Sequence, residues 1–382
     1  MAMRWRILLL LFLIRSIMAF QFASIGAIAP LIGNEFQVDA VAIGALIGIY
    51  FAPGIFVALP GGAVASRLGD RRVVLVGLAL MVAGSALMAA SGTWEAQTAG
   101  RIIAGIGGVV LNVVMSKMVM DWFAGREIAT AMSVFVNSWP AGIALALIVQ
   151  PMVAESGGVF VSFGLEAVLA SMGLIALLLF YREPEQTVGA APAQAKFPAG
   201  YAFAAILSAG MVWGLFNAAL AIIFSFSPTL LVEGGSSLTQ AGASTSLVMW
   251  GVMVAGILGG FLADRVRRPQ VILTLVTLVF AVLLLTLPRS GGSALVIAAL
   301  GIAAGLSVGP IMTLPANVLN ADTRAFGMGL FYTLYYACFS VTPWLSGKLI
   351  ASTSVARVFD FGAAIAVVSL VFVWLSLKFS RR

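Results

Sequence analysis

Three charged side chains stand inside long apolar stretches of the sequence and are the first candidates for chemistry. They are Arg15, Arg101 and Glu166. A charge held away from water is costly unless it meets an opposite charge, a ligand or a water molecule. A guanidinium is suited to binding carboxylates, and a carboxylate can carry a proton. These residue types therefore indicate anion binding and proton transfer.

Arg15 lies about nine residues into the first apolar run, which corresponds to a depth of about 13 Å at the rise of an α-helix. No acidic residue stands one turn away, because Leu11, Phe12, Met18 and Ala19 occupy those positions. Its charge could be balanced by a structural ion pair, by snorkelling to the membrane surface, or by an anionic substrate. We expect Arg15 to bind the substrate, which would then be a small anion.

Glu166 lies about seven residues, or about 10 Å, into another apolar run. Because burial disfavours the charged form of a carboxylate, Glu166 could take up a proton near neutrality. It could instead pair with Arg101 or occupy an interface that water reaches. Arg101 serves equally well as a structural charge partner or in proton or substrate binding. Glu166 and Arg101 are thus the candidates for proton coupling.

Several polar and aromatic residues in the other apolar runs could complete a small polar cavity around Arg15. They are Gln21, Tyr50, Asn137, Trp213, Asn217, Tyr332, Tyr335 and Tyr336. Each one taken singly could equally be a packing residue or an interfacial anchor. Pro140 follows Asn137 closely, and a proline frees a backbone carbonyl and can kink its helix.

The composition places these residues in a membrane. Of the 382 residues 62% are hydrophobic and only 9% are charged, and the mean hydropathy is +1.10. A soluble domain has about 25% charged residues. In lipid the backbone must pair internally, and long continuous apolar runs favour helices over a barrel. We therefore expect an all-α membrane protein with about a dozen spans of about 20 to 25 residues.

Apolar runs and polar turns alternate along the whole chain. We expect helices over about 7–32, 41–65, 73–90, 96–120, 128–149, 159–181, 201–230, 239–262, 271–287, 294–318, 327–350 and 357–377. The first run is too long for the core of a signal peptide, which has about 7–15 residues. A polar linker rich in alanine and proline, 182–200, divides the chain into an N-terminal bundle, 1–181, and a C-terminal bundle, 201–382.

The distribution of basic residues predicts the orientation. Most lysines and arginines fall in the loops on the side of the two termini, so both termini should be cytoplasmic in an inner membrane. The net charge of +7 then reflects orientation and not nucleic-acid binding. No histidine is present, and Cys338 is the single cysteine. We expect no metal, cofactor or disulfide, and a monomer in the bilayer.

A short basic segment occurs twice, 198 positions apart, and indicates a duplicated membrane protein. The copies are 62–72 and 260–268, with Gly62 aligned on Gly260 and Arg67 on Arg265. Both resemble the signature loop of the major facilitator superfamily, a glycine, three residues, Asp-Arg, and then basic residues. The second copy keeps Asp264 and Arg265, whereas the first has Ser66 at the aspartate position.

The resemblance implies two pseudo-symmetric six-helix bundles that give alternating access to a central site. It also implies a conformational lock on the cytoplasmic side, although the same charges could simply be positive-inside loops. The lock residues would be Gly62, Arg67, Asp70, Arg71, Asp264 and Arg265. Arg101 followed by spaced glycines resembles the helix 4 motif of the superfamily. An arginine in helix 1 loosely resembles the cyanate and nitroimidazole transporter-like branch.

These features predict a secondary active transporter for a small anionic solute, which could be coupled to protons. The alternative is a drug or metabolite efflux antiporter. Its helix 5 motif is only partly present around Pro140, and the deep charge here is positive. A transport-dead sensor would add a soluble domain, and an intramembrane enzyme would need converging catalytic groups. Neither feature is found, so we expect no enzymatic activity.

Overall fold

The computed structural model describes residues 3–57, 69–124, 127–184, 197–266, 268–320 and 322–380. Within these ranges the secondary structure is entirely helical, as expected for an all-α membrane protein. The first half contains α1 (Met3–Ala27), α2 (Ala29–Phe36), α3 (Ala40–Ile49), α4 (Ala52–Val57), α6 (Asp70–Ala90), α7 (Trp94–Trp122), α8 (Ile128–Val136), α9 (Ser138–Gly157) and α10 (Val159–Phe180). The second contains α11 (Gly200–Glu233), α12 (Leu238–Arg265), α13 (Pro269–Arg289), α14 (Ala294–Ala316), α15 (Arg324–Ser352) and α16 (Val355–Ser380).

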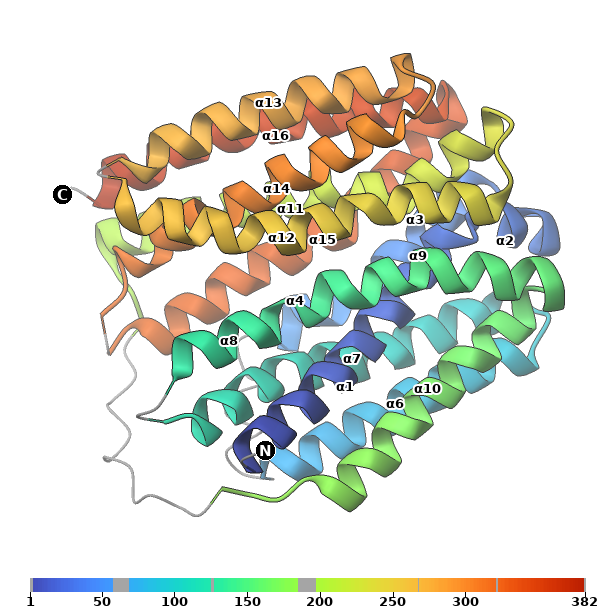
Figure 1. Ribbon diagram of the computed structural model, residues 1–382, viewed down its shortest axis with the longest axis horizontal. Helices are drawn as coiled ribbons and strands as arrows, with labels where there is room; N and C mark the ends of the chain where they lie inside the picture. The colour runs from blue at the N-terminus through green and yellow to red at the C-terminus, as the bar shows by residue number, and fades with distance from the viewer. Residues whose placement is uncertain are drawn as a thin grey trace.

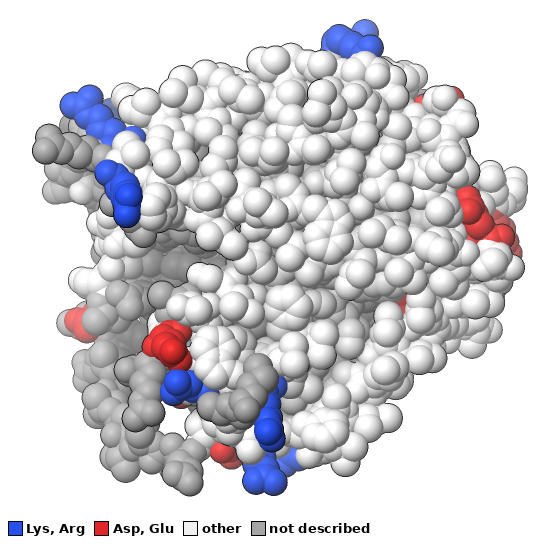
Figure 2. Space-filling model, in the orientation of Figure 1, with Lys and Arg blue, Asp and Glu red and all other residues white. Residues whose placement is uncertain are grey.

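The two halves form two bundles that lie side by side with their helices roughly parallel (Figure 1). Eleven segments of the described chain are long and apolar enough to cross a membrane. The 29-residue helix α15 runs beside α11. Together with the eleven segments it gives the twelve spans expected from the sequence. Both termini lie at the same end, which we call the terminal end, and the opposite end is called the far end (Figure 1). On the face shown in Figure 2, charged side chains gather toward these ends and few are visible between them.

Three spans that were expected to be continuous are broken. The breaks lie at Ile28, at Tyr50 and Phe51, and at Asn137. In each case a proline follows within three residues, namely Pro30, Pro53 and Pro140. A proline has no N–H to donate and its ring clashes with the carbonyl four residues earlier, so the helix breaks just before it.

Small residues let neighbouring helices approach closely within each half. Gly84 packs against the backbone at Gly100 where α6 crosses α7, and Gly301 packs against Val248 where α14 meets α12. Gly105, in the spaced-glycine segment after Arg101, packs against the backbone of Tyr50. Close packing at small residues is the usual way in which membrane helices associate. The glycines of α7 thus let this helix approach both α6 and the break after α3 closely.

The two halves touch each other from the middle of the molecule to the far end. Gly44 and Gly48 of α3 lie against the backbone of Pro343 and Ser340 in α15. Glu155 of α9 accepts hydrogen bonds from the backbone N–H of Thr239 in α12, at 3.2 Å, and from its hydroxyl, at 2.5 Å. Glu155 thereby caps the first turn of α12 from the other half. At the terminal end, a recess opens between the halves (Figure 2).

The predicted linker and lock are described only in part. Helix α10 ends at Phe180 and α11 begins at Gly200, but residues 185–196 lie outside the described residues. The same holds for Gly62 and Arg67 and for the side chain of Asp264. Asp70 binds Lys117 at 2.5 Å, and Arg71 donates to the carbonyl of Leu178 at 2.9 Å. Both contacts stay within the first half, and Arg265 lies over the ring of Phe261 at 4.1 Å.

Candidate functional site

Arg15 lies between the two halves, on the side of α1 that faces α7, α8 and α9. Its Nε donates to Asn112 Oδ1 at 2.8 Å. Its Nη1 lies 3.1 Å from the carbonyl oxygens of both Phe135 and Val136, and 3.3 Å from Ser138 Oγ. The guanidinium carbon is 4.8 Å from the centre of the Phe135 ring. All these acceptors are neutral, so they hold the guanidinium without balancing its charge.

The break between α8 and α9 supplies the hydrogen-bond acceptors of Arg15 Nη1. Because Pro140 has no N–H, the carbonyl of Val136, four residues earlier, lacks its usual partner within a helix. This carbonyl and that of Phe135 are at the C-terminal end of α8, where the helix dipole is negative. Both features favour a cation. The proline predicted to free a carbonyl therefore frees the one that receives Arg15.

No carboxylate of the described residues balances Arg15. The ion pairs among those residues join Arg4 to Glu127, Lys117 to Asp70 and Asp121, and both Arg289 and Arg357 to Asp360. Nη2 of Arg15 makes no hydrogen bond to any described residue, whereas its Nε and Nη1 are both engaged. With respect to the part of the chain that the structure describes, the guanidinium thus has one free donor group and no opposite charge beside it.

Aromatic side chains from both halves close the space on the far-end side of Arg15. Phe22 and Phe51 come from the first half, and Phe224, Tyr336 and Phe339 from the second. The ring centres of Phe51 and Tyr336 are 5.5 Å apart, and those of Phe22 and Phe339 are also 5.5 Å apart. We call these five residues the aromatic roof. All five are buried, so the roof separates Arg15 from the far end.

The tyrosines of α15 lie on the opposite wall of the recess. Tyr332, Tyr335 and Tyr336 are close enough to Arg15 to interact with its charge. Tyr336 receives a hydrogen bond from Asn112 Nδ2 at 3.3 Å. Tyr332 keeps 36% of its surface exposed although it faces the other half. Because Tyr332 lies one helical turn nearer the terminal end than Tyr336, this exposure indicates that the recess is open toward that end.

Trp213, Asn217 and Asn137 lie near this site without contacting Arg15. Trp213 stacks on Tyr335, with ring centres 6.0 Å apart. The amide of Asn217 donates to the carbonyl of Trp213 at 2.9 Å, and the amide of Asn137 to the carbonyl of Ser133 at 3.0 Å. Both asparagines therefore use their amide N–H groups on their own helix. Their part in substrate binding stays a prediction.

Gln21 and Tyr50 belong to a second polar cluster, inside the first half. Tyr50 donates to Gln21 Oε1 at 3.0 Å, and Gln21 Nε2 donates to Ser85 Oγ at 2.6 Å. Ser85 in turn donates to Glu166 Oε2 at 3.3 Å, and Gln150 donates to Glu166 Oε1 at 3.1 Å. The structure thus links two predicted substrate residues to the predicted proton carrier. It does not place them beside Arg15.

Arg101 lies in the same cluster and is completely buried. It donates to the carbonyls of Leu46 at 3.2 Å, Gln21 at 2.6 Å and Phe22 at 2.5 Å. Its guanidinium carbon is 4.5 Å from the centre of the Tyr50 ring. No ion pair joins Arg101 directly to Glu166 among the described contacts. Gln21 connects them instead, because its carbonyl accepts from Arg101 and its amide donates to Ser85, which donates to Glu166. Arg101 is therefore, like Arg15, a cation placed deep among apolar side chains.

Asn112 is a contact of Arg15 that sequence reasoning missed. It lies about three helical turns after Arg101 on α7, which places the two residues on similar faces of the helix. An amide in an otherwise apolar run was the available signal. Ser85, Gln150 and Ser138 were missed because small hydroxyls and amides are common in membrane helices as local hydrogen-bonding groups.

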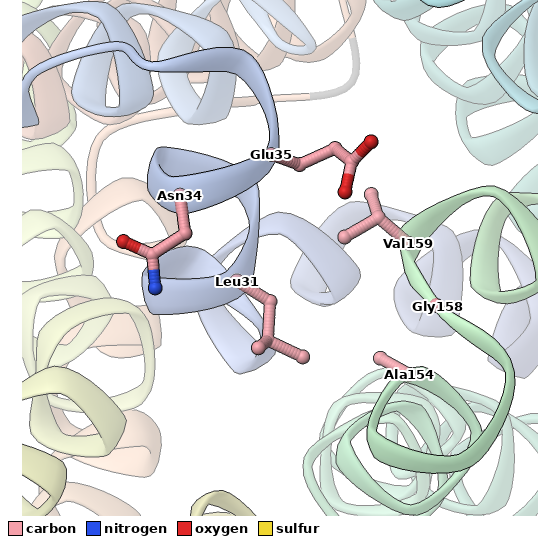
Figure 3. A pocket seen from close by; sticks show the side chains of 6 residues that line it. All are labelled: Leu31, Asn34, Glu35, Ala154, Gly158 and Val159. Carbon is pink, nitrogen blue, oxygen red and sulfur yellow. The ribbon is translucent and has the colours of Figure 1, made fainter.

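Two shallow pockets lie away from this site. One, of about 200 Å³, is at the far end between α2 and the turn joining α9 to α10, where Leu31, Glu35 and Val159 line it (Figure 3). The other, of about 290 Å³, is lined by Met312, Leu319 and other apolar residues at the terminal ends of α14 and α15. Neither contains a charge that would recognise an anion.

The comparison with known families agrees with this geometry. The model of the Major Facilitator Superfamily matches residues 11–235 and 202–382. This chain belongs to that superfamily. Members are transporters, which agrees with the twelve-helix fold and the recess between the halves. The resemblance to the cyanate and nitroimidazole branch is not supported by these comparisons.

Two curated relatives and one solved structure are similar over most of the chain. The 4-hydroxybenzoate transporter PcaK of Pseudomonas aeruginosa is 26% identical over 85% of this chain and 81% of its own. The hexuronate transporter of Bacillus subtilis is 22% identical over 69% of this chain and 65% of its own. The crystal structure of a D-xylose-proton symporter shares the fold with a TM-score of 0.80, at 16% identity over 98% of both chains.

Proposed function

We propose that this protein is a secondary transporter that moves a small, ring-bearing organic carboxylate across the membrane. One observation carries the proposal: Arg15 is held between the halves by neutral acceptors only, with Nη2 free of the described residues. A cation arranged in this way gains most from a ligand that supplies a carboxylate. The relatives named for 4-hydroxybenzoate and hexuronate are named for ring-bearing carboxylates.

The aromatic roof favours a ligand with a ring. A carboxylate bound at Nη2 would leave the rest of the ligand against Phe51 and Tyr336, whose rings stack with planar or ring-shaped groups. The tyrosine hydroxyls of α15 could hydrogen-bond to hydroxyl groups on the ligand. The site would be reached from the terminal end in this conformation, and from the far end after the two halves rock. One chain contains the whole site, so a monomer suffices.

Orientation and coupling extend the proposal. The terminal end faces the cytoplasm of an inner membrane, because basic residues concentrate there. Glu166 carries the coupling proton, since it is a buried carboxylate within hydrogen-bond reach of Ser85 and Gln150. Glu166→Gln should then keep substrate counterflow in proteoliposomes but lose the response to a pH gradient. Intact proton-driven uptake in this variant would make Glu166 structural.

Binding to purified protein tests the role of Arg15. We compare 4-hydroxybenzoate with the neutral 4-hydroxybenzamide, and glucuronate with glucose. Wild type should prefer the charged member of a pair by about 10- to 100-fold, the value of a hydrogen bond to a charged group. Arg15→Ala should abolish this preference while the protein stays folded. Arg15→Lys keeps the charge but loses the planar fork, and should weaken binding.

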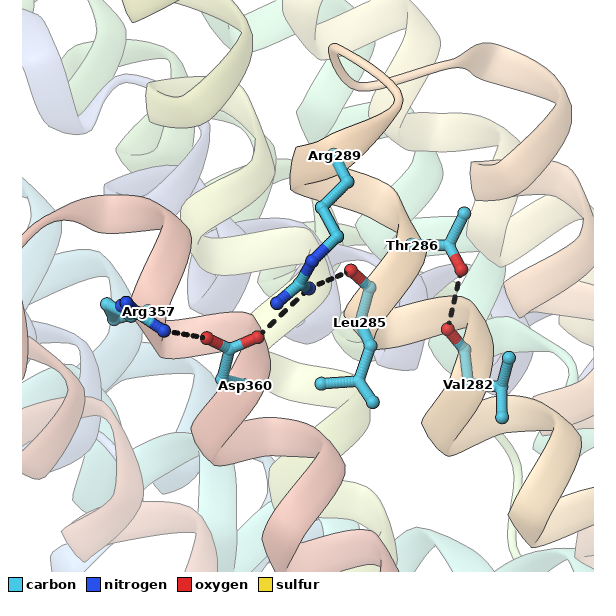
Figure 4. A network of polar contacts seen from close by, with 6 residues as sticks. All are labelled: Val282, Leu285, Thr286, Arg289, Arg357 and Asp360. Carbon is cyan, nitrogen blue, oxygen red and sulfur yellow. Dashed lines mark hydrogen bonds and ion pairs between the residues drawn. The ribbon is translucent and has the colours of Figure 1, made fainter.

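Arg289→Ala is the matched control. Arg289 is an arginine at the far end of α13 whose Nη1 lies 3.2 Å from Asp360. Asp360 keeps a second partner, Arg357, at 3.0 Å, so the substitution leaves this carboxylate paired (Figure 4). The control should bind as wild type does. Normal carboxylate affinity in folded Arg15→Ala protein would reject the anion site.

A further inference from the structure

Asn112 is the residue through which Arg15 touches the second half. Its Oδ1 accepts from Arg15 Nε at 2.8 Å, and its Nδ2 donates to the hydroxyl of Tyr336 at 3.3 Å. Each end of the amide meets a complementary group, so the side chain is fixed in one orientation. Asn112 on α7 therefore connects α1 of the first half to α15 of the second.

We infer that Asn112 is a positioning residue that gives the site its preference for anions. It orients the guanidinium and, being neutral, leaves its charge available to a ligand. The inference rests on the proposed function, because it assumes that a carboxylate binds Arg15. It adds a residue that determines selectivity without serving as the charge partner itself.

The geometry explains how the positioning works. Nε is held by Asn112, and Nη1 is held by the carbonyls of Phe135 and Val136. Because a guanidinium is planar and rigid, fixing these two nitrogens fixes the direction of Nη2. The free donors then keep one position, and the bound carboxylate loses less conformational freedom than it would with a mobile arginine.

The choice of an amide over a carboxylate matters as much as its position. Aspartate has the same shape as asparagine, but it would place a negative charge at the 2.8 Å contact with Arg15 Nε. Opposite charges this close attract strongly where water is scarce. The protein would then supply the counter-charge that a ligand otherwise provides. Asn112→Asp should therefore remove the preference of the site for an anionic ligand over a neutral one.

Selectivity, and not affinity alone, is the measurement that tests this idea. We take the ratio of the affinities for 4-hydroxybenzoate and 4-hydroxybenzamide in purified protein. Asn112→Asp should lower the ratio by about 10- to 100-fold, mainly through weaker carboxylate binding. Asn112→Ala removes the acceptor without adding a charge and should lower the ratio by about 3- to 10-fold. In an Arg15→Ala background, Asn112→Asp should have no further effect on the ratio.

The remaining outcomes separate this inference from the proposed function. The control is Asn34→Asp, the same chemical change at an exposed position of α2. If wild type prefers the carboxylate but both Asn112 variants keep the wild-type ratio, the positioning role is wrong and the anion site stands. An equal loss of both ligands at an unchanged ratio would show a structural role and overturn the inference. If wild type binds neither charged ligand of the panel, the proposed function itself fails.

Discussion

Arg15 and Arg101 are both arginines placed deep among apolar side chains, yet their hydrogen bonding differs. Arg101 uses Nε, Nη1 and Nη2 on backbone carbonyls of α1 and α3 and is completely buried. Arg15 uses Nε and Nη1 and lies beside a recess open at the terminal end. A cation whose donors are all engaged by the backbone stabilises the fold. A cation with a free donor can serve a ligand.

We predict that Arg101→Leu strongly destabilises the protein. The substitution removes the partner of three carbonyls, and it removes the buried positive charge that acts through space on the carboxylate of Glu166, a loss of about 3–5 kcal/mol. Thermal unfolding of purified protein in detergent measures the effect. Glu166→Gln in the same chain removes the charge of that carboxylate and should restore part of the stability. Additive losses in the double variant would show that the two groups do not interact.

At the scale of elements, the interruption between α8 and α9 shapes the site. Helix α8 ends at Val136, α9 begins at Ser138, and the side chain of Ser138 donates to the Phe135 carbonyl at 2.5 Å. These groups present oxygen atoms toward α1 where a regular helix would have used them internally. The kink is thus the means by which an apolar helix offers polar groups to Arg15.

Pro140→Ala tests this role of the interruption. Alanine restores an N–H that can bond to the Val136 carbonyl, so α8 and α9 should become more regular. Thermal stability should stay equal or rise, while affinity for 4-hydroxybenzoate falls by about 3- to 10-fold as Arg15 loses an acceptor. Pro288→Ala, at the far end of α13, is the matched proline control. Unchanged affinity in folded Pro140→Ala protein would mean that the position of Arg15 does not depend on the proline.

The helices were predictable from the sequence, and the direction of their side chains was not. The expected segment 96–120 corresponds to α7, Trp94–Trp122, and 201–230 to α11, Gly200–Glu233. Gln21 and Tyr50, however, face the interior of the first half and not Arg15. Lipid-facing and protein-facing sides of a membrane helix are both apolar, so periodicity does not show which side faces a cavity. Arg15 was found because its charge alone requires a partner.

At the scale of the molecule, the halves meet at the far end and separate at the terminal end. The glycines of α3 lie against the α15 backbone, and Glu155 caps α12 across the interface. At the terminal end, Asp70 and Arg71 bind partners within their own half. The arrangement explains why the predicted lock between the halves is not formed by these two residues here. Rocking would have to separate α3 from α15.

Gly48→Val should therefore shift the protein away from the arrangement that is open at the terminal end. A Cβ at Gly48 would overlap the carbonyl oxygen of Ser340, and the α15 backbone cannot yield as a side chain could. Overpacking of this kind costs about 1–3 kcal/mol, enough to change the ratio of two conformations by about fivefold or more. The variant should fold, because the conformation open at the far end does not require this contact.

Thiol accessibility measures the shift. Tyr332→Cys places a reporter at an exposed position of the recess, in a chain whose native cysteine is replaced by Cys338→Ala. A membrane-impermeant thiol reagent added on the terminal side should modify this cysteine readily, and about fivefold or more slowly when Gly48→Val is present. Gly164→Val, where a Cβ would meet no other atom, is the control and should leave the rate unchanged. Equal rates in all three proteins would show that the contact between α3 and α15 does not govern access to Arg15.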